Sequence, residues 1–419
     1  MSTVETDRPS DAVTAADEPA PFEPREGVPE VLVTAEQVQH YAGLLQQGTG
    51  PLAVDAERAS GFRYSQRAYL VQLRRAGAGT ALIDPVAAGT LASIAEATTG
   101  VEWILHAATQ DLPCLAELGM RPDLLFDTEL AGRLLGRERV SLSALVRSEL
   151  GEVLEKGHGA ADWSARPLSA AQLRYAALDV ELLPELRDAL ESALREAGKW
   201  EIAQQEFEAL VHFEPRPRAE EPWRRTSGIH KLRSPRMLAV VRALWEQRDG
   251  LAQRQDVAPG RLLPDASIII AAQSNPASID ALLDTKGFVG RGAARYARLW
   301  WEAITSARAL PDSELPVGSP PPSGPPPPKA WADRNPPAWA RLSAARTALA
   351  ERAEALGMPV ENVMTPDLVR RLCWEPPAEI SAAAVAAELT AAGARSWQVD
   401  ATVDSLVEAL LADVLVTDE

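Results

Sequence analysis

Acidic residues in three separated stretches of the chain have the types and the spacing that a divalent-metal site needs. Asp55 and Glu57 stand two residues apart, directly after a short apolar run. Asp111 lies in a second stretch, and Tyr175 and Asp179 stand four residues apart in a third. Four carboxylates at close range would repel one another, whereas Mg²⁺ and Mn²⁺ favour oxygen ligands. The set predicts a site for two Mg²⁺ or Mn²⁺ ions that hydrolyses phosphodiester bonds.

Strands must position the first pair of carboxylates. Residues 51–57 read as a strand, on which Asp55 and Glu57 share one face because side chains alternate between faces. Residues 69–73 and 80–84 read as two further strands, and the glycines between them mark a tight turn. This spacing predicts an antiparallel meander at the start of a mixed α/β domain.

A helix must position the last pair. Residues 169–179 have a helical pattern, with Ser169 as the N-cap and Gln172 as its capping-box partner. On this helix Tyr175 and Asp179 share a face, so the tyrosine hydroxyl can aim the attacking water. Asp111 is expected at the end of a strand at 103–106 or on the first turn after it.

Composition limits the class of protein. The chain has 419 residues, of which 46% are apolar, enough for two to four globular domains. Its apolar runs fall short of the ~20 residues of a membrane span, and its acidic start is unlike a signal peptide. Cys114 and Cys373 stand in apolar helical contexts, which favours buried thiols over a disulfide. These features predict a cytoplasmic protein without a membrane partner.

Charge is distributed unevenly along the chain. The net charge of −17 argues against a nucleic-acid partner at first sight, since phosphate is bound by Lys and Arg. Residues 222–308, however, carry fourteen Lys and Arg against seven acids, a net of +7. Residues 1–30 have a net of −6 and residues 331–419 a net of −7. One basic segment inside an acidic protein is the expected footprint of a phosphate-binding module.

Pro-rich and polar stretches divide the chain into segments. The predicted order is an acidic disordered tail at 1–27, an α/β domain with the acidic site residues at 28–212, a linker at 213–226, a helical domain at 227–310, a Pro-rich linker at 311–335 and a second helical domain at 336–419.

The three acidic stretches resemble the motifs of a known superfamily. Val-Asp-Ala-Glu at 54–57, His-x-Ala-x-x-Asp-Leu at 106–112 and Tyr-x-x-x-Asp at 175–179 are similar to the three exonuclease motifs of the tyrosine-containing DEDD exonucleases. Connecting text such as Phe126-Asp127-Thr128 and the stretch 162–168 narrows the resemblance to ribonuclease D, over about residues 30–205. The resemblance implies an RNase H-like fold, a mixed sheet flanked by helices.

The resemblance also implies roles for individual residues. Asp55, Glu57, Asp111 and Asp179 match the metal ligands, and Tyr175 matches the residue that orients water. Ala107 departs from the pattern, because related exonucleases often carry Asn there. That Asn is not a metal ligand, so we do not expect its absence to remove activity.

The first helical segment resembles an HRDC domain, a small bundle that binds nucleic acid in helicases and in ribonuclease D. The similarity runs through Arg261-Leu-Leu-Pro-Asp265 and Lys286-Gly-Phe288. The second helical segment resembles a more diverged HRDC domain, and its negative charge favours packing over phosphate binding. The expected RNA-binding residues are Lys156, Lys286, Arg291, Arg295 and Arg298. An alternative without RNA binding stays open: the HRDC residues would then form a solvated basic helix face, and Lys156 would be a surface lysine.

The sequence therefore predicts a metal-dependent 3′→5′ exoribonuclease that releases nucleoside 5′-monophosphates. RNA 3′ ends, tRNA precursors among them, are the substrates that the resemblance implies. One alternative is a DNA exonuclease of the same superfamily, because the metal site acts on phosphate and does not choose the sugar. The other is an inactive, RNA-binding scaffold, which the presence of all five motif residues disfavours.

Overall fold

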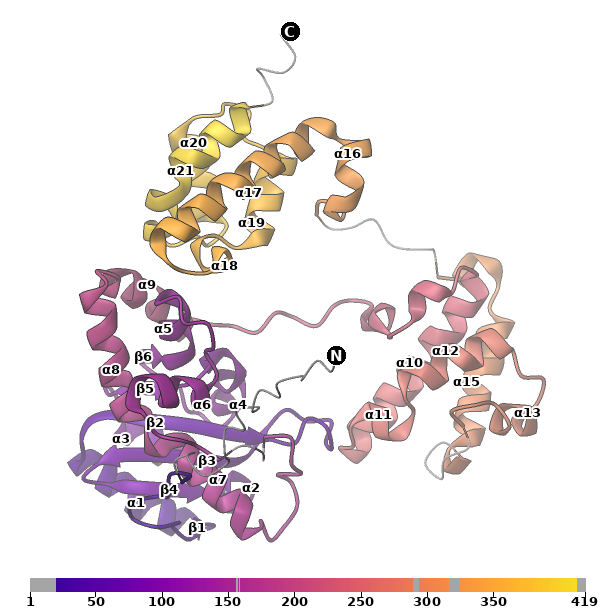
Figure 1. The fold of residues 1–419 in the computed structure, drawn as a ribbon. Coiled ribbons are helices and arrows are strands. Elements are labelled where there is room, and N and C mark those ends of the chain that lie inside the picture. Colours follow the sequence, from indigo (N-terminus) through magenta and orange to yellow (C-terminus); the bar gives the residue numbers. More distant parts are fainter. Residues whose placement is uncertain (1–19, 156, 158, 289–293, 317–323, 413–419) are drawn as a thin grey trace, which may run out of the picture.

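A computed structural model describes residues 20–412 of the chain, apart from 156, 158, 289–293 and 317–323. One mixed sheet with flanking helices comes first, and two helical domains follow (Figure 1). The sheet has the strand order β1-β4-β3-β2-β5-β6. Its strands are β1 (Val31–Leu32), β2 (Thr49–Arg58), β3 (Ala68–Ala76), β4 (Gly79–Ile83), β5 (Glu102–Leu105) and β6 (Leu124–Asp127). This architecture confirms the expected RNase H-like class.

The central strand of the sheet, β2, carries the first acidic pair. It pairs antiparallel with β3, which pairs antiparallel with β4, so the expected meander is confirmed. On its other side β2 pairs in parallel with β5, and β5 in parallel with β6. The segment after β5, which contains Asp111, therefore leaves the sheet next to the strand that carries Asp55 and Glu57.

Helices cover both faces of the sheet. Leu52 and Val54 point into a core that includes residues of α1, α3 and α4, whereas Ala53 packs in the core that contains residues of α7 and α8. Because strand side chains alternate, Asp55 and Glu57 continue the Ala53 face toward α7. The helical elements of this domain are α1 (Ala35–Gln47), α2 (Pro85–Ala88), α3 (Ala92–Ala97), η1 (Ala108–Gln110), α4 (Leu112–Glu117), α5 (Thr128–Leu134), α6 (Leu142–Leu145), η2 (Val146–Leu150), α7 (Ala170–Glu181), α8 (Leu183–Glu196) and α9 (Trp200–Val211).

The first helical domain has a core of its own. Trp300 and Phe288 are fully buried in it, and Trp223 of the expected linker is 2% exposed in the same core. Residues 222–226 thus belong to this domain, which begins earlier than the sequence suggested. Its elements are η3 (Pro222–Arg225), η4 (Ile229–Lys231), α10 (Pro235–Gln255), α11 (Pro259–Leu262), α12 (Asp265–Ser274), α13 (Ile279–Leu283) and α15 (Ala297–Ala309).

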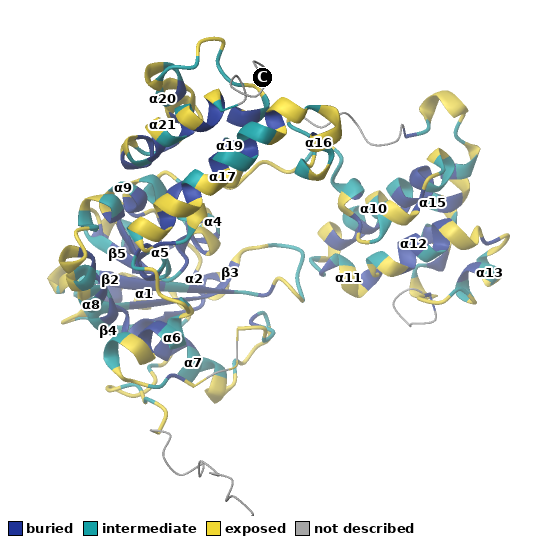
Figure 2. Ribbon diagram, turned by 45° about the horizontal axis from the view of Figure 1, so that its top comes forward, coloured by how far each residue is buried: buried dark blue, intermediate teal, exposed yellow. Residues whose placement is uncertain are grey.

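The second helical domain shares one continuous apolar core with the first domain, the mixed sheet and its flanking helices. Figure 1 shows it beside α9 and α5, and Figure 2 shows how buried residues line the inward faces of its helices. Trp331 is fully buried against Trp374, so the end of the expected Pro-rich linker belongs to this domain. The short η5 (Asp312–Glu314) follows the first helical domain in the chain. The elements of the second helical domain are η6 (Pro328–Ala330), α16 (Trp331–Arg334), α17 (Pro336–Leu356), α18 (Val360–Val363), α19 (Pro366–Trp374), α20 (Ala382–Ala391) and α21 (Ser396–Leu411).

The two helical domains follow the same order of elements. Each begins its bundle with a 21-residue helix, α10 or α17, and continues with a four-residue helix, α11 or α18. In both, the residue after the long helix has left-handed backbone angles, Asp256 with φ 47° and Gly357 with φ 57°. The two corners therefore occupy the same place in the order of elements.

The described part of the expected disordered tail lies on the domain that contains the sheet. The Phe22 amide donates to the Val153 carbonyl at 2.7 Å, and Glu23 pairs with Arg174 at 2.6 Å. Residues 20–27 therefore belong to the surface of this domain, which begins before the expected boundary. Both cysteines are buried and free, as expected. Within the described part of the chain, none of the helices has the length and apolar character required to cross a bilayer.

Candidate active site

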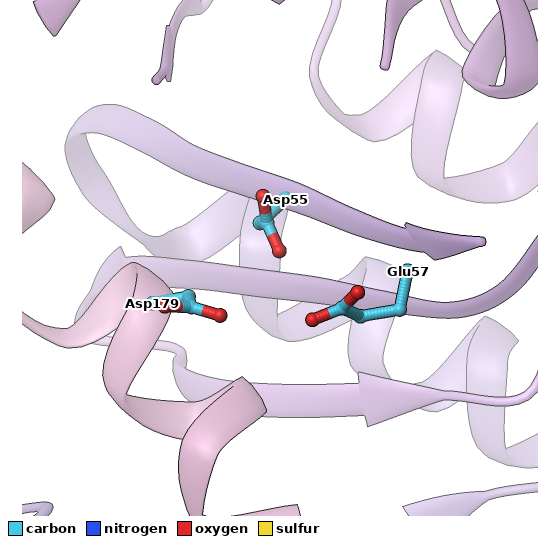
Figure 3. A group of neighbouring side chains, drawn as sticks. All are labelled: Asp55, Glu57 and Asp179. Carbon is cyan, nitrogen blue, oxygen red and sulfur yellow. The ribbon is translucent and has the colours of Figure 1, made fainter. Parts of the chain in front are cut away.

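Three carboxylates from two elements meet at the centre of the catalytic domain. Asp55 and Glu57 come from β2 and Asp179 from α7, and one oxygen of each lies within 4.8 Å of the others. Figure 3 shows the three side chains directed toward a common point. The alternation of β2 and the packing of α7 across the β2 face together produce this arrangement.

Asp111 reaches the same cavity from a strained turn after β5. Ala107 has φ 60°, a left-handed conformation that is uncommon for residues other than glycine and asparagine. The buried carboxylate of Asp127 holds the turn, because it accepts the Ala107 amide at 3.1 Å and the Ala108 amide at 2.7 Å. Asp127 also caps α5 by accepting the Leu130 amide at 3.0 Å. Alanine at 107, where related exonucleases often carry Asn, therefore makes the left-handed backbone conformation less favourable. It does not change the carboxylates that could bind a metal.

The four carboxylates and Tyr175 line one cavity of about 390 Å³. Its remaining wall includes the β2–β3 loop, which we define as residues 59–67, and the stretch 159–161. All five motif residues that the sequence singled out are thus brought together in the structure. Tyr175 and Asp179 occupy successive turns of α7, whose Ser169 and Gln172 form the expected capping box.

Burial and mutual repulsion disfavour the charged forms of these carboxyl groups. Burial raises the pKa of Asp55 to about 6. Burial, and then the charges of the neighbouring carboxylates, raise the pKa of Glu57 to about 10. The pKa values of Asp111 and Asp179 are raised well above their ordinary range for the same reasons. A site with this electrostatic character favours the binding of cations.

Arg58 is the one permanent cation among the described residues that line the cavity. Its Nη2 lies 3.8 Å from an Asp111 carboxylate oxygen, and its charge opposes the rise in the pKa of Asp55, Glu57 and Asp111. The register of β2 against β3 shifts between Glu57 and Arg58, and such bulges commonly redirect side chains beside active sites. One arginine leaves most of the negative charge of four carboxylates uncompensated.

The donor set fits a divalent metal. All four ligands are carboxylates, the hard oxygen donors that Mg²⁺ and Mn²⁺ favour. His106 does not neutralise the carboxylates, because burial lowers its pKa to about 4 and leaves the imidazole uncharged at pH 7. The Tyr175 hydroxyl likewise keeps its proton, since burial and the nearby carboxylates raise its pKa. It hydrogen-bonds to Asp179.

Arg166 holds the loop before α7 in place. Arg166 donates through Nε to the Asp84 carboxylate at 2.6 Å and through Nη2 to the Tyr69 carbonyl at 2.7 Å. Its Nη1 donates to the Trp163 carbonyl. The Trp163 side chain is fully buried, and its ring lies tilted against the Tyr175 ring, with the ring centres 6.3 Å apart. These contacts fix the start of the helix that carries Tyr175 and Asp179.

The expected RNA-binding residues lie away from the cavity or outside the described part of the chain. Lys156 and Arg291 fall on residues that the structure does not describe. Lys286, Arg295 and Arg298 are exposed on the first helical domain, and none of the three lines the cavity. Arg298 pairs with Glu302 at 3.5 Å. Their role in binding RNA stays a prediction.

Sequence reasoning missed two residues of the site. Asp127 was quoted only as part of a resemblance, although an Asp directly before a helix is a recognisable N-cap signal. Arg58 stands next to Glu57 in the sequence, but strand alternation would send it to the opposite face. Only the irregular register of β2 brings it among the carboxylates.

Three family models match the chain. A 3′-5′ exonuclease model matches residues 29–195, an HRDC domain model residues 237–304, and a model described as the 3′ to 5′ exonuclease C-terminal domain residues 324–410. The first helical domain thus matches the module that the sequence suggested. The second matches a different model from the first.

Curated relatives and solved structures agree with these matches. A ribonuclease D from Acidiphilium cryptum is 33% identical over 335 residues, 77% of this chain and 81% of that protein. A ribonuclease D from Gluconacetobacter diazotrophicus is 39% identical over 51% of this chain and 55% of that protein. A crystal structure of a Bifidobacterium adolescentis protein superimposes with a TM-score of 0.85 at 40% identity, covering 94% of this chain and all of that one. Escherichia coli RNase D, described as an exoribonuclease involved in structured RNA processing, has a TM-score of 0.65 at 21% identity over 91% of this chain and 98% of that one, which is a likeness of fold.

Proposed function

This chain belongs to the ribonuclease D family, and on that basis we propose that it is a metal-dependent 3′→5′ exoribonuclease. The observation that carries the proposal is the cluster of Asp55, Glu57 and Asp179, whose oxygens lie within 4.8 Å of one another in an open cavity. Hydrolysis from the 3′ end would release nucleoside 5′-monophosphates.

Four carboxylates would hold the metal ions: Asp55, Glu57, Asp111 and Asp179. Two Mg²⁺ or Mn²⁺ ions would activate a water and stabilise the leaving 3′ oxygen. Tyr175 keeps its hydroxyl proton at neutral pH, so it can hydrogen-bond to the attacking water and orient it. Asp127 fixes the turn that presents Asp111, and Arg58 offsets part of the negative charge beside it.

The substrates that we propose are RNA 3′ ends, including those of tRNA precursors. Ribonuclease D is the name of the curated relatives, and the basic character of residues 222–308 supports an RNA-contacting role for the first helical domain. The second helical domain has a net negative charge and repeats the helix order of the first, which supports a diverged HRDC-like domain that packs instead of binding phosphate.

The test is hydrolysis of a 5′-labelled RNA with a tRNA-like body and a 3′ trailer, in Mg²⁺, Mn²⁺ or EDTA. We expect a ladder that shortens from the 3′ end with either metal and stays absent in EDTA. Asp55→Asn should lower the rate by about 10³-fold or more, because metals supply several kcal/mol of charge stabilisation. Tyr175→Phe should reduce kcat more than metal affinity.

A matched single-stranded DNA decides between ribonuclease and deoxyribonuclease, since the 2′-hydroxyl is the chemical difference between them. Faster hydrolysis of the DNA would overturn the RNA assignment. Intact RNA in every lane together with a clear gel shift would instead identify an inactive binding protein. Near-normal turnover by the Asp55→Asn variant would contradict the assignment of the metal ligands.

A further inference from the structure

The first helical domain contacts a loop that lines the active site, and it does so through its α10–α11 corner. In Figure 1 the β2–β3 loop (residues 59–67) extends from the sheet toward α11. The Ala258 amide donates to the Phe62 carbonyl at 3.0 Å, and Arg261 Nε donates to the Gly61 carbonyl at 2.8 Å. The same loop lines the cavity through Ser60, Gly61 and Phe62. A wall of the catalytic cavity is therefore held by a different domain.

Asp256 fixes the outer part of this loop. Its carboxylate accepts the Ser65 amide at 2.8 Å and the Tyr69 hydroxyl at 3.2 Å, and it lies 3.8 Å from Arg67 Nη2. From the catalytic side, Arg63 Nε donates to the Ser164 hydroxyl at 2.8 Å. These contacts hold the loop from two sides. Its first residues, Ser60 to Phe62, lie at the cavity.

Phe62, in the part of the loop that lines the cavity, forms a pair with Arg261. The Arg261 guanidinium carbon lies 4.0 Å from the centre of the Phe62 ring, a cation–π contact that covers one face of the ring. Phe62 is half-buried against the apolar cluster that includes Trp163, and it also lines the cavity, whereas Arg261 contacts the ring from the first helical domain. Arg261 is exposed, and its two terminal nitrogens have no hydrogen-bond acceptor among the described residues.

An aromatic ring backed by a guanidinium at the wall of a nuclease cavity suits single-stranded nucleic acid. Bases stack on aromatic rings regardless of sequence, and arginine adds contacts to phosphate oxygens. A stacking surface at this point would hold a base of the strand as it enters, close to the carboxylate cluster. Lys286, Arg295 and Arg298, the exposed basic residues of the same domain, do not line the cavity.

We propose that Phe62 and Arg261 together form an interdomain subsite for the 3′-terminal region of single-stranded RNA. Phe62 stacks on a base of the entering strand, and the free guanidinium nitrogens of Arg261 bind a phosphate oxygen. This inference rests on the proposed ribonuclease function. It gives the first helical domain a direct part in the active site.

Binding and turnover of an RNA with 2-aminopurine near its 3′ end test the subsite. The full-length protein is compared with Phe62→Leu, Arg261→Ala and the double variant. Binding is followed in Ca²⁺ by fluorescence anisotropy and by quenching of 2-aminopurine, and turnover is followed in Mg²⁺. We expect each single change to weaken binding about 10-fold, as loss of one stacked base does, and to reduce the quenching. The double variant should lose less than the product of the two single effects, because the side chains act as a pair.

Two matched variants separate this subsite from simpler explanations. Arg233→Ala removes an exposed positive charge of the same domain, at the opposite end of α10 from Asp256. Asp256→Asn weakens the hold on the loop without removing either member of the pair. We expect both variants to quench 2-aminopurine as the wild type does, and all variants to bind Mn²⁺ with unchanged affinity in calorimetry.

Specific outcomes would overturn the subsite. Wild-type quenching by Arg261→Ala or Phe62→Leu contradicts a stacking role. An equal loss with Arg233→Ala points to general charge, and an equal loss with Asp256→Asn points to loop support alone. Failure of the wild type to hydrolyse RNA contradicts the proposed function instead, while intact hydrolysis with insensitive variants contradicts only the subsite.

Discussion

The two helical domains contact the catalytic domain through equivalent corners that use different chemistry. The corner after α10 has Asp256, whose carboxylate bonds to the β2–β3 loop. The corner after α17 has Gly357, whose carbonyl accepts Lys199 Nζ at 3.1 Å and closely approaches Gly136. One attachment is polar and touches a wall of the active site. The other lies at the edge of the shared apolar core, in which the next residue, Met358, is buried, and it lies away from the active site.

This difference shows how one helical plan can serve two purposes. A shared core stabilises through buried apolar area and tolerates little rearrangement. A set of hydrogen bonds at a loop contributes modestly to stability but fixes the geometry of the groups that it holds. We therefore expect changes at the second helical domain to affect stability, and changes at the first to affect RNA binding.

The largest expected effect is at Trp397, which joins α21 to α9. Its indole is 7% exposed and donates to the Glu206 carboxylate at 2.9 Å, while its amide donates to Gln205 at 3.1 Å. Trp397→Ala should lower the free energy of unfolding by about 3–5 kcal/mol, as large aromatic truncations in cores do. Urea unfolding followed by circular dichroism measures the loss.

The control for Trp397 is Trp397→Phe, which keeps most of the apolar contact and should cost less than half as much. Activity per folded molecule should change little in either variant. A stability loss below about 1 kcal/mol for the alanine variant would contradict a shared core.

Gly136 tests the closest approach between the two domains. It has φ +69°, and an added Cβ would lie 2.4 Å from the Gly357 carbonyl oxygen. Gly119 has φ +79° with nothing within 4 Å of an added Cβ. Gly119→Ala should cost about 1 kcal/mol from backbone strain alone, and Gly136→Ala about 1–3 kcal/mol more from the clash. Equal thermal shifts of the two variants would mean that the corner is not tightly docked.

Metal removal should affect the catalytic site without touching either attachment. The folded-state pKa of Asp55 is raised to about 6 and that of Glu57 to about 10. Between about pH 4 and these values the unfolded chain has released protons that the folded chain retains, so metal-free stability falls as the pH rises. Metal binding replaces those protons, and the stabilisation by Mn²⁺ should therefore grow from pH 5.5 to pH 8.

Differential scanning calorimetry in EDTA and in Mn²⁺ at several pH values measures this effect. At a metal concentration about 100 times Kd, stabilisation of about 2.7 kcal/mol is expected. Asp179→Asn should raise metal-free stability at pH 8 and reduce the Mn²⁺ effect. A Mn²⁺ effect that is the same at every pH would contradict the coupling between protons and metal.

The smallest expected effect concerns Ala107, in the turn after β5. Ala107→Gly relieves a left-handed strain of about 1–2 kcal/mol, and the added flexibility of the unfolded chain offsets about 0.5–1 kcal/mol of it. The net gain should be about 0.5 kcal/mol in urea unfolding, with unchanged RNA binding. A loss of stability would mean that the turn held by Asp127 does not strain the alanine.

Local patterns predicted the elements that carry the site. Alternation along 51–57 indicated the face shared by Asp55 and Glu57, and the capping box at Ser169 indicated the start of α7. Both signals lie within a few residues of chain, which is the range over which backbone geometry is set by sequence. The domain edges were less accurate, because Trp223 and Trp331 enter their cores from stretches whose proline content suggested linkers.

The sequence by itself therefore determined the fold class, the family and the five motif residues of the cavity, since each depends on short spacings or on motif identity. Only the tertiary structure decided that Arg58 lies beside Asp111, that Asp127 holds the turn, and that Arg261 covers Phe62. The last of these contacts joins residues about 200 positions apart in different domains. No periodicity encodes such a contact, because it depends on how two independently folded surfaces meet.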